Sequence, residues 1–254
     1  MADQSLLRSS LFEQYDFTAL FTLRHEGVSP PPFDSFNFGY GLGDAERNIE
    51  QNLHILQHAA ELPGLPHQLI QVHGTEHYLA EGPGYMHSDE ADILISNQPG
   101  TALGVRTADC LPVMLADPEA GIIAAVHAGW RGTAAAVVNR ALDEMLKQGA
   151  IADKIIASLG PCIGPCCFKI GEDTAQQLSA SCSGSDSHIL RSPEPHADIK
   201  AINRLQLLTA GIDASRIEML GACTACHPEH YFSYRRDGKK SGRHLGVVAL
   251  PSRP

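Results

Sequence analysis

The chain has 254 residues, of which 43% are hydrophobic and 19% are charged, so it is an ordinary globular sequence able to bury a core rather than a disordered one. Its 19 basic and 29 acidic residues give a formal charge of −10, which disfavours nucleic acid and anionic membranes as partners. The N-terminal residues lack the basic start and apolar run of a secretion signal, and no stretch is apolar enough to span a membrane. We therefore expect a cytoplasmic protein whose seven cysteines are reduced thiols.

The predicted elements follow hydrophobic periodicity and turn residues. Residues 17–24 favour a strand, and a loop rich in Pro and Gly then leads to a helix that we expect Asp44 to cap. An amphipathic helix is predicted over 129–149, and a loop over 181–188. The other predicted helices cover 172–181 and 198–211, and the other strands cover 67–74, 91–96, 101–107, 111–117, 121–127, 154–160, 216–221, 231–236 and 246–250.

The strands gather in the first half of the chain without a regular alternation of strand and helix. That order favours an α+β fold over a doubly wound sheet. No repeat or low-complexity linker divides the sequence. We expect a single compact domain, residues 1–254, made of packed mixed β-sheets flanked by helices.

Three side chains able to bind a metal lie at the ends of predicted strands, in the stretches QVHG, TADCLP and VHAGWRG: His73, Cys110 and His127. Two imidazoles and one thiolate would form a three-ligand zinc site with a position open for water or substrate, as catalytic sites require. Such an ion lowers the pKa of water and polarises a leaving group. The alternative is that the histidines are hydrogen-bonded at strand ends and that the cysteine is a small buried hydrophobe.

Positive charge is concentrated in two places. Arg131 stands where a strand passes into a helix, whose first N–H groups favour an anion. Residues 231–243 carry five basic side chains, although DGKKSG also suits an exposed hairpin tip. Arg131, Arg236 and Arg243 could bind phosphate or a carboxylate, and the alternative for Arg131 is a solvated side chain at a Gly-rich turn. Asp109, next to a candidate ligand, either supports that ligand and carries a proton or only caps a turn.

Five of the seven cysteines lie in two short stretches. CTACH at 223–227 matches the C-x-x-C-H pattern of covalent haem attachment, but haem proteins of that kind mature after export. PCIGPCC at 161–167 contributes Cys162, Cys166 and Cys167, which together with Cys223 and Cys226 suggest a separate zinc or iron–sulfur site. The spacing C-x3-C-C fits no common metal loop, however, and buried thiols around a tight turn are a sufficient explanation.

The order of the motifs resembles one family. FTLRHEGVS, FNFGYGLGD, QVHGTEH, ADILISNQPG, RTADCLPVMLAD, AAVHAGWRGTAAAVV, LGPCIGPCCFKIG and CTACHPEHYFSYRRDG follow one another between residues 17 and 248. Together they resemble the laccase-domain family, described both as multicopper polyphenol oxidoreductases and as purine nucleoside phosphorylases. The resemblance implies a metal, Zn²⁺ or alternatively Cu²⁺, on His73, Cys110 and His127, and no haem. Glu26 stands where members often have Gly, which alters the backbone expected of that loop.

The resemblance implies phosphorolysis of adenosine, inosine, guanosine and methylthioadenosine, with phosphate as co-substrate, and deamination of adenosine. One alternative is a copper-dependent polyphenol oxidase, although the chain lacks the paired H-x-H patterns of multicopper enzymes. A second is an amide hydrolase with Cys110 as nucleophile and His73 or His127 as base, as in members described as peptidoglycan editing factors. The third is a metal-binding module without catalytic activity.

Overall fold

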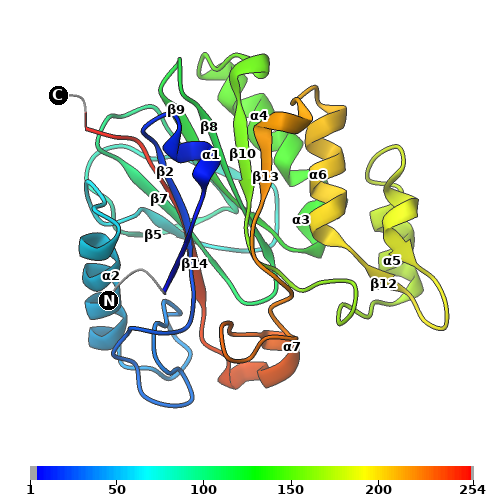
Figure 1. The fold of residues 1–254 in the computed structure, drawn as a ribbon, viewed down its shortest axis with the longest axis horizontal. Coiled ribbons are helices and arrows are strands. Elements are labelled where there is room, and N and C mark those ends of the chain that lie inside the picture. The colour runs from blue at the N-terminus through cyan, green and yellow to red at the C-terminus, as the bar shows by residue number, and fades with distance from the viewer. Residues whose placement is uncertain (1–4, 253–254) are drawn as a thin grey trace.

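The structure is a computed structural model that describes residues 5–252, so the predicted domain bounds lie outside the described residues. Its main elements form four layers: helix α2 (Glu46–Ala59), a four-stranded sheet, a six-stranded sheet, and a layer that contains α4 (Val137–Lys147) and α6 (Ile199–Thr209) (Figure 1). The predicted α+β class, with mixed sheets flanked by helices, is confirmed. Within residues 5–252, no helix is both long and apolar enough to cross a membrane.

The four-stranded sheet is antiparallel throughout. In spatial order its strands are β1 (Leu6–Arg8), β2 (Thr18–Thr22), β14 (His244–Ala249) and β7 (Ala102–Thr107). Helix α2 covers the outer face of this sheet, because Leu53 and Leu56 lie four and seven residues after Ile49 and so form one apolar stripe. Leu53 and Leu56 pack in one core with Leu20 and Val247 of the two central strands.

The six-stranded sheet is mixed, since its two edge strands run parallel to their neighbours while the inner strands are antiparallel. In spatial order its strands are β13 (Ile217–Met219), β10 (Ile156–Leu159), β8 (Leu111–Asp117), β9 (Ile122–Ala128), β6 (Ile93–Ser96) and β4 (His77–Leu79). Every residue of β8 and β9 is buried, because the other sheet covers one face and helices cover the other. Their sequences are therefore almost continuously apolar.

Two further cores hold the layers together. Between the sheets, Phe21 and Val248 pack with Met114 and Ile123. On the far side of the six-stranded sheet, the apolar faces of α4 and α6 pack against β8 and β9. The smaller elements are α1 (Ser10–Glu13), β3 (Gln68–Ile70), β5 (Met86–Glu90), α3 (Trp130–Ala134), η2 (Ala152–Lys154), α5 (Glu172–Ser179), η3 (Ser185–His188), β11 (Ile189–Leu190), β12 (His196–Ala197), η4 (Ala214–Arg216), α7 (Tyr234–Asp237) and η5 (Gly238–Lys240).

Several predicted boundaries were wrong. The single helix expected over 129–149 is two helices, α3 and α4, because Ala136 adopts a left-handed conformation with φ 55°. Asp44 does not cap α2, whose N-cap is Ala45. Its carboxylate instead accepts hydrogen bonds from the side-chain amides of Asn37 and Asn48, at 2.9 and 2.7 Å.

The strand predicted over 231–236 is also wrong, because this segment turns into the short helix α7. Ser233 caps the helix by accepting a hydrogen bond from the backbone N–H of Arg236. The backbone N–H of Arg235 donates to the distant carboxylate of Asp109, a contact that local sequence does not reveal. The segment 181–188, expected to be a loop, contains η3.

Asn52 fixes the long loop before α2. It is fully buried on that helix, and its side chain accepts from the backbone N–H of Val28 at 2.9 Å. It also donates to the hydroxyl of Ser29 at 3.0 Å and to the carbonyl of Asn37 at 2.8 Å. The chain that leaves this anchored loop continues to Tyr40, which lines the main cavity of the protein.

The close approach of the two sheets gives a stability prediction. A Cβ added at Gly160 would overlap the buried ring of Phe21, whereas one added at Gly64 would meet no atom within 4 Å. We expect Gly160→Ala to lower the free energy of unfolding by about 1–3 kcal/mol, the usual cost of overpacking. Urea unfolding followed by circular dichroism measures it, with Gly64→Ala as the matched control. Equal unfolding midpoints for the two variants would contradict the packing described.

Candidate functional site

Cys110 and His127 come together because β8 and β9 are antiparallel neighbours. The register pairs Leu111 with Ala128 and Pro112 with His127. Cys110, the residue before β8, therefore lies beside the end of β9. Two residues separated by seventeen positions meet at one edge of the sheet for purely topological reasons.

His73 reaches the same edge from an irregular segment that follows β3. The strand is shorter than predicted, and His73 itself has φ 62°, in the left-handed region. Its Nε2 lies 3.8 Å from the Sγ of Cys110, and its ring meets that of His127 edge-on at a centroid distance of 4.8 Å. One ligand atom from each of the three residues lies within 4.8 Å of the others. The structure therefore brings together the three residues predicted as metal ligands.

Asp92 organises this group. It precedes β6, and its side chain is fully buried. One oxygen accepts from Nδ1 of His127 at 2.6 Å and from the backbone N–H of His73 at 3.0 Å. The other accepts from the backbone N–H groups of Val72 and Gly74, at 3.2 and 2.6 Å. One carboxylate thus fixes a side chain on β9 and the unusual backbone that carries His73.

Gly129 leaves room for the ligands. A Cβ at this position would lie 2.8 Å from Cδ2 of His73 and 3.1 Å from Sγ of Cys110. Distances this short are repulsive, so any larger side chain would push the imidazole and the thiol apart. The glycine of VHAGWRG is needed here for the absence of a side chain rather than for an unusual φ.

The electrostatics of the group favour a thiolate. Burial alone would raise the pKa of Cys110, but the charges and hydrogen bonds of His127 and His73 together outweigh burial and lower that pKa to about 6. Burial would lower the pKa of His127, yet the Cys110 thiolate and the Asp92 carboxylate raise it to about 9. For Asp92, burial opposes ionisation, and the hydrogen bonds from His127 and the backbone still lower its pKa.

This arrangement fits a metal ion. Because Asp92 occupies Nδ1 of His127, Nε2 is the nitrogen left to bind a metal, and the tautomer is set by the carboxylate. A thiolate and two imidazoles are the ligands that zinc and copper prefer. Three protein ligands leave a coordination position for water or substrate, as a catalytic centre needs.

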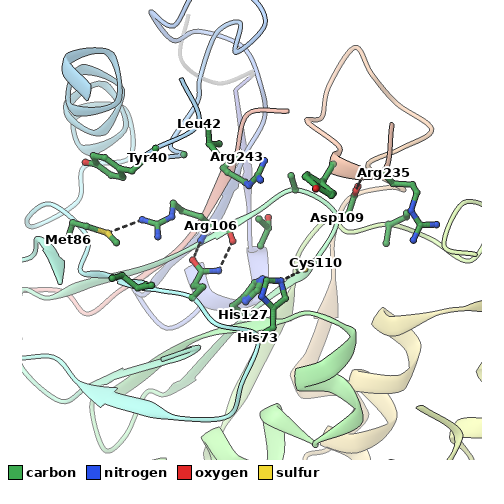
Figure 2. A pocket seen from close by; sticks show the side chains of 18 of the residues that line it. Tyr40, Leu42, His73, Met86, Arg106, Asp109, Cys110, His127, Arg235 and Arg243 are labelled. Atoms are coloured by element: carbon green, nitrogen blue, oxygen red, sulfur yellow. Dashed lines mark hydrogen bonds between the residues drawn. The ribbon is translucent and has the colours of Figure 1, made fainter. Parts of the chain in front are cut away.

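A cavity of about 780 Å³ opens over the three residues. Figure 2 shows Arg243 above the group and Arg106 beside it, below Tyr40. The remaining lining is largely apolar, with Leu42, Ile70, Met86, Ile163 and Phe168 among its residues. Cation and metal-ligand groups therefore share one mostly hydrophobic chamber, a common design for a small-molecule site.

Arg106 and Arg243 are half-buried cations. The guanidinium of Arg106 donates to the side chain of Gln68 at 3.1 Å and to the carbonyl of Leu69 at 2.7 Å, while Arg243 donates to the carbonyls of Ser241 and Gly242. Neither forms an ion pair with a carboxylate among residues 5–252. Burial, helped by the like charge of Arg243, lowers the pKa of Arg106 to about 10. Both charges are poised for an anionic ligand.

Asp109 lines the cavity, but its carboxylate already has partners. One oxygen accepts from the hydroxyl of Thr224 and the other from the backbone N–H of Arg235, both at 2.6 Å. Its backbone has φ 89° and is held by a hydrogen bond from the N–H of Ile163 to its carbonyl. These contacts favour a positioning role for Asp109, and the proton-carrying role stays a prediction.

The other two arginines predicted to bind phosphate do not line this cavity. Arg131 is exposed and stacks on Trp130, with its Cζ 4.3 Å from the ring centroid, at a separate shallow hollow. Arg236 donates to the carbonyls of Thr224 and Tyr231 and pairs with Asp237. Of the predicted arginines, the structure places only Arg243 at the cavity.

Sequence reasoning missed three residues of the site. Arg106 is a single charge within the buried strand β7, and such a charge is a recognisable signal. Gln71 exchanges two 2.8 Å hydrogen bonds with the backbone of Arg106, which ties the His73 segment to that strand. Asp92 stands among three acidic residues between 89 and 92, and nothing local distinguishes it from the other two.

Comparison with known proteins gives consistent results. A purine nucleoside phosphorylase of Deinococcus radiodurans is 36% identical over 235 residues, covering 92% of this chain and 89% of that protein. An adenosine deaminase named RL5, from an unknown prokaryote, is 38% identical over 155 residues, covering 60% of this chain and 59% of that protein. The crystal structure of a hypothetical protein YfiH from Bacillus licheniformis superposes with a TM-score of 0.90, at 27% identity and 98% coverage of both chains.

The family assignment rests on most of the sequence. The matching family is described as multi-copper polyphenol oxidoreductase laccase, and its match runs over residues 18–251. That range includes all three candidate metal ligands, Asp92 and the half-buried cavity arginines Arg106 and Arg243. The chain belongs to the multi-copper polyphenol oxidoreductase laccase family, whose relatives include proteins named purine nucleoside phosphorylase and adenosine deaminase.

Proposed function

We propose that this chain is a zinc-dependent purine nucleoside phosphorylase, with adenosine, inosine, guanosine and methylthioadenosine as substrates and adenosine deamination as a second activity. One observation carries the proposal. Two half-buried arginines without a carboxylate partner, among residues 5–252, line the same cavity as a three-ligand metal group. An anion site and a Lewis-acidic centre in one chamber suit phosphorolysis, because one holds the phosphate and the other can polarise the leaving base. The names of two relatives point to the same chemistry.

The chain's own residues divide the work of binding. Arg243 and Arg106 would hold phosphate through charge-assisted hydrogen bonds. The apolar and aromatic lining, Tyr40 and Phe168 included, would take the purine and ribose and exclude water from the reacting bond. A phosphate oxygen then attacks C1′ of the ribose, the glycosidic bond breaks, and its electron pair leaves with the purine, which takes up a proton.

His73, Cys110 and His127 would hold the zinc ion, which when bound supplies Lewis acidity and lowers the pKa of water at this end of the cavity. Asp92 keeps Nδ1 of His127 protonated, so that Nε2 faces the ligand group. The same carboxylate fixes the backbone of His73. The two imidazoles are therefore oriented before any ligand arrives, which lowers the reorganisation that binding requires.

A second candidate function is supported by the same geometry. Asp92, His127 and Cys110 form a series in which a carboxylate orients an imidazole beside a thiolate. This is the arrangement of a cysteine hydrolase, so amide hydrolysis stays open for the metal-free protein. A thiolate bound to zinc is a poor nucleophile, so the two functions exclude one another at a given site.

Polyphenol oxidation, which the family description names, has less support. Within residues 5–252, the groups able to hold a metal are the three-ligand group and a set of four cysteines. A multicopper oxidase needs a histidine-rich cluster for several copper ions. Copper bound in place of zinc at the three-ligand group would explain a weak oxidase activity.

Metal removal tests the central claim. We expect the zinc protein to convert inosine to hypoxanthine and ribose 1-phosphate only when phosphate is present. The protein stripped with a chelator should lose this activity and regain it with Zn²⁺.

Substitution of any one ligand should have the same effect: Cys110→Ala, His73→Ala and His127→Ala should each abolish phosphorolysis and adenosine deamination. Chromatography of the products measures both reactions, and a metal-free variant that still performs phosphorolysis would exclude the metal mechanism. Amide hydrolysis gained on stripping would favour the hydrolase.

The arginines give a second prediction, with a matched control on the surface. Removing one hydrogen-bonded charge costs about 1.5–3 kcal/mol. Arg243→Gln and Arg106→Gln should therefore each lower kcat/KM for phosphate by roughly 10- to 100-fold, with a smaller effect on kcat/KM for the nucleoside. Arg131→Gln should leave both values unchanged, because its side chain lies outside the cavity. A loss confined to Arg131→Gln would contradict this assignment.

Asp92 gives a third prediction. Asp92→Asn is nearly isosteric but no longer provides a charged acceptor to Nδ1 of His127. We expect zinc affinity or activity to fall roughly 10- to 100-fold, as is typical for partners of metal-bound histidines. A competition titration with a chromophoric chelator measures the affinity directly. Unchanged zinc affinity in a folded Asp92→Asn protein would show that the ligands do not depend on this carboxylate.

A further inference from the structure

Four thiols that are distant in sequence form a second group outside the cavity. Cys166 and Cys167 follow β10, and Cys223 and Cys226 precede α7. Their four sulfur atoms all lie within 4.8 Å of one another. Cys226 Sγ is 3.4 Å from that of Cys166 and 3.3 Å from that of Cys167. Two of the thiols are exposed, so burial around a turn does not account for the cluster.

We propose that Cys166, Cys167, Cys223 and Cys226 bind one zinc ion as a structural tetrathiolate site, separate from the candidate active site. Four thiolates are the ligand set of closed structural zinc sites, in which no position stays open for substrate. The ligands come from two loops that are separated in sequence by helices α5 and α6. The site would therefore act as a cross-link between those loops.

The spacing of the sulfurs suits a single ion. A zinc–sulfur bond of about 2.3 Å in a tetrahedron places the sulfurs about 3.8 Å apart, close to the separations seen here. An iron–sulfur cluster needs space for several metal ions between its cysteines, and thiols in mutual contact leave none. Two disulfides would need sulfurs bonded at about 2.05 Å, and the four atoms are instead gathered around one point.

The surroundings hold the two loops in place and supply a hydrogen bond to one of the sulfurs. The backbone N–H of Gly164 donates to the Sγ of Cys223 at 3.2 Å. Arg235 donates to the carbonyl of Cys167 at 3.2 Å, and Arg236 donates to the carbonyls of Thr224 and Ala225 at 3.0 and 3.3 Å. Two guanidinium groups thus hold the backbone of both loops in place around the four sulfurs. Hydrogen bonds of this kind orient metal ligands.

The same loops reach the candidate active site. Thr224, between two of the cysteines, donates to the carboxylate of Asp109, and Ile163 donates to its carbonyl. The two loops also pair with each other where Cys162 and Cys223 form a β-bridge. A zinc ion that ties the loops would thereby hold the residue that precedes Cys110. The role proposed for it is structural, and it needs no particular reaction in the cavity.

Native mass spectrometry of protein purified from zinc-supplemented cells tests the site. We expect two zinc ions per wild-type chain, and one in Cys226→Ser. Cys110→Ala should also retain one, and X-ray absorption at its zinc edge should show four sulfur ligands at about 2.3 Å. Cys182→Ser removes a thiol that contacts Ser185 instead of the cluster, so it should retain two. Hydrogen exchange in residues 161–168 and 222–236 should increase in Cys226→Ser alone.

The outcomes separate this site from the proposed function. One zinc in the wild type and none in Cys226→Ser would support the structural site and contradict the catalytic zinc of the proposed function. Wild-type zinc content in Cys226→Ser, nitrogen or oxygen ligands in Cys110→Ala, or disulfide-linked peptides among the four cysteines would each overturn the proposal. If Cys226→Ser does not fold, the wild-type stoichiometry and the absorption spectrum of Cys110→Ala still decide.

Discussion

The buried carboxylate of Asp92 is the contact on which the candidate active site depends. It accepts from the imidazole of His127 and from three consecutive backbone N–H groups around His73. A buried charge is costly unless its hydrogen bonds are satisfied, and here four donors satisfy it. The carboxylate therefore has one stable arrangement, and that arrangement fixes both histidines. Cys110 needs no such help, because the pairing of β8 with β9 already places it.

The distribution of charge would allow an acidic protein to bind the anion proposed for its cavity. The net charge of −10 would repel phosphate at long range. Inside the cavity, Arg106 and Arg243 lack carboxylate partners among the described residues, so their charge is not neutralised locally. Keeping two guanidinium groups half-buried in this way destabilises the empty protein. An anion bound between them would offset this desolvation penalty, which would contribute to its affinity.

Much of the fold, but only part of the site, could be predicted from the sequence. The continuous apolar runs of β8 and β9 and the periodicity of α6 were sufficient to predict those elements, and the α+β class followed from their order. The break at Ala136 was not predictable, since alanine favours a helix and nothing local indicates its left-handed φ. The strand ends allowed the convergence of His73, Cys110 and His127 as one of two alternatives, and the resemblance to the family favoured it. Asp92 was not, because only the pairing of β6 with β9 brings it to His127.

The positions of the arginines show the limit of local reasoning most clearly. Arg131, Arg236 and Arg243 are equally charged and equally close to motifs in sequence, yet tertiary contacts send them to a surface stack, a backbone clamp and the cavity. Arg236 still contributes to the site indirectly, since it donates to the carbonyl of Thr224, whose hydroxyl in turn donates to the carboxylate of Asp109. Basic residues near the C-terminus therefore have two roles: Arg243 faces the cavity, and Arg236 holds the loop behind it. A cavity of this kind is shaped as much by the second group as by the first.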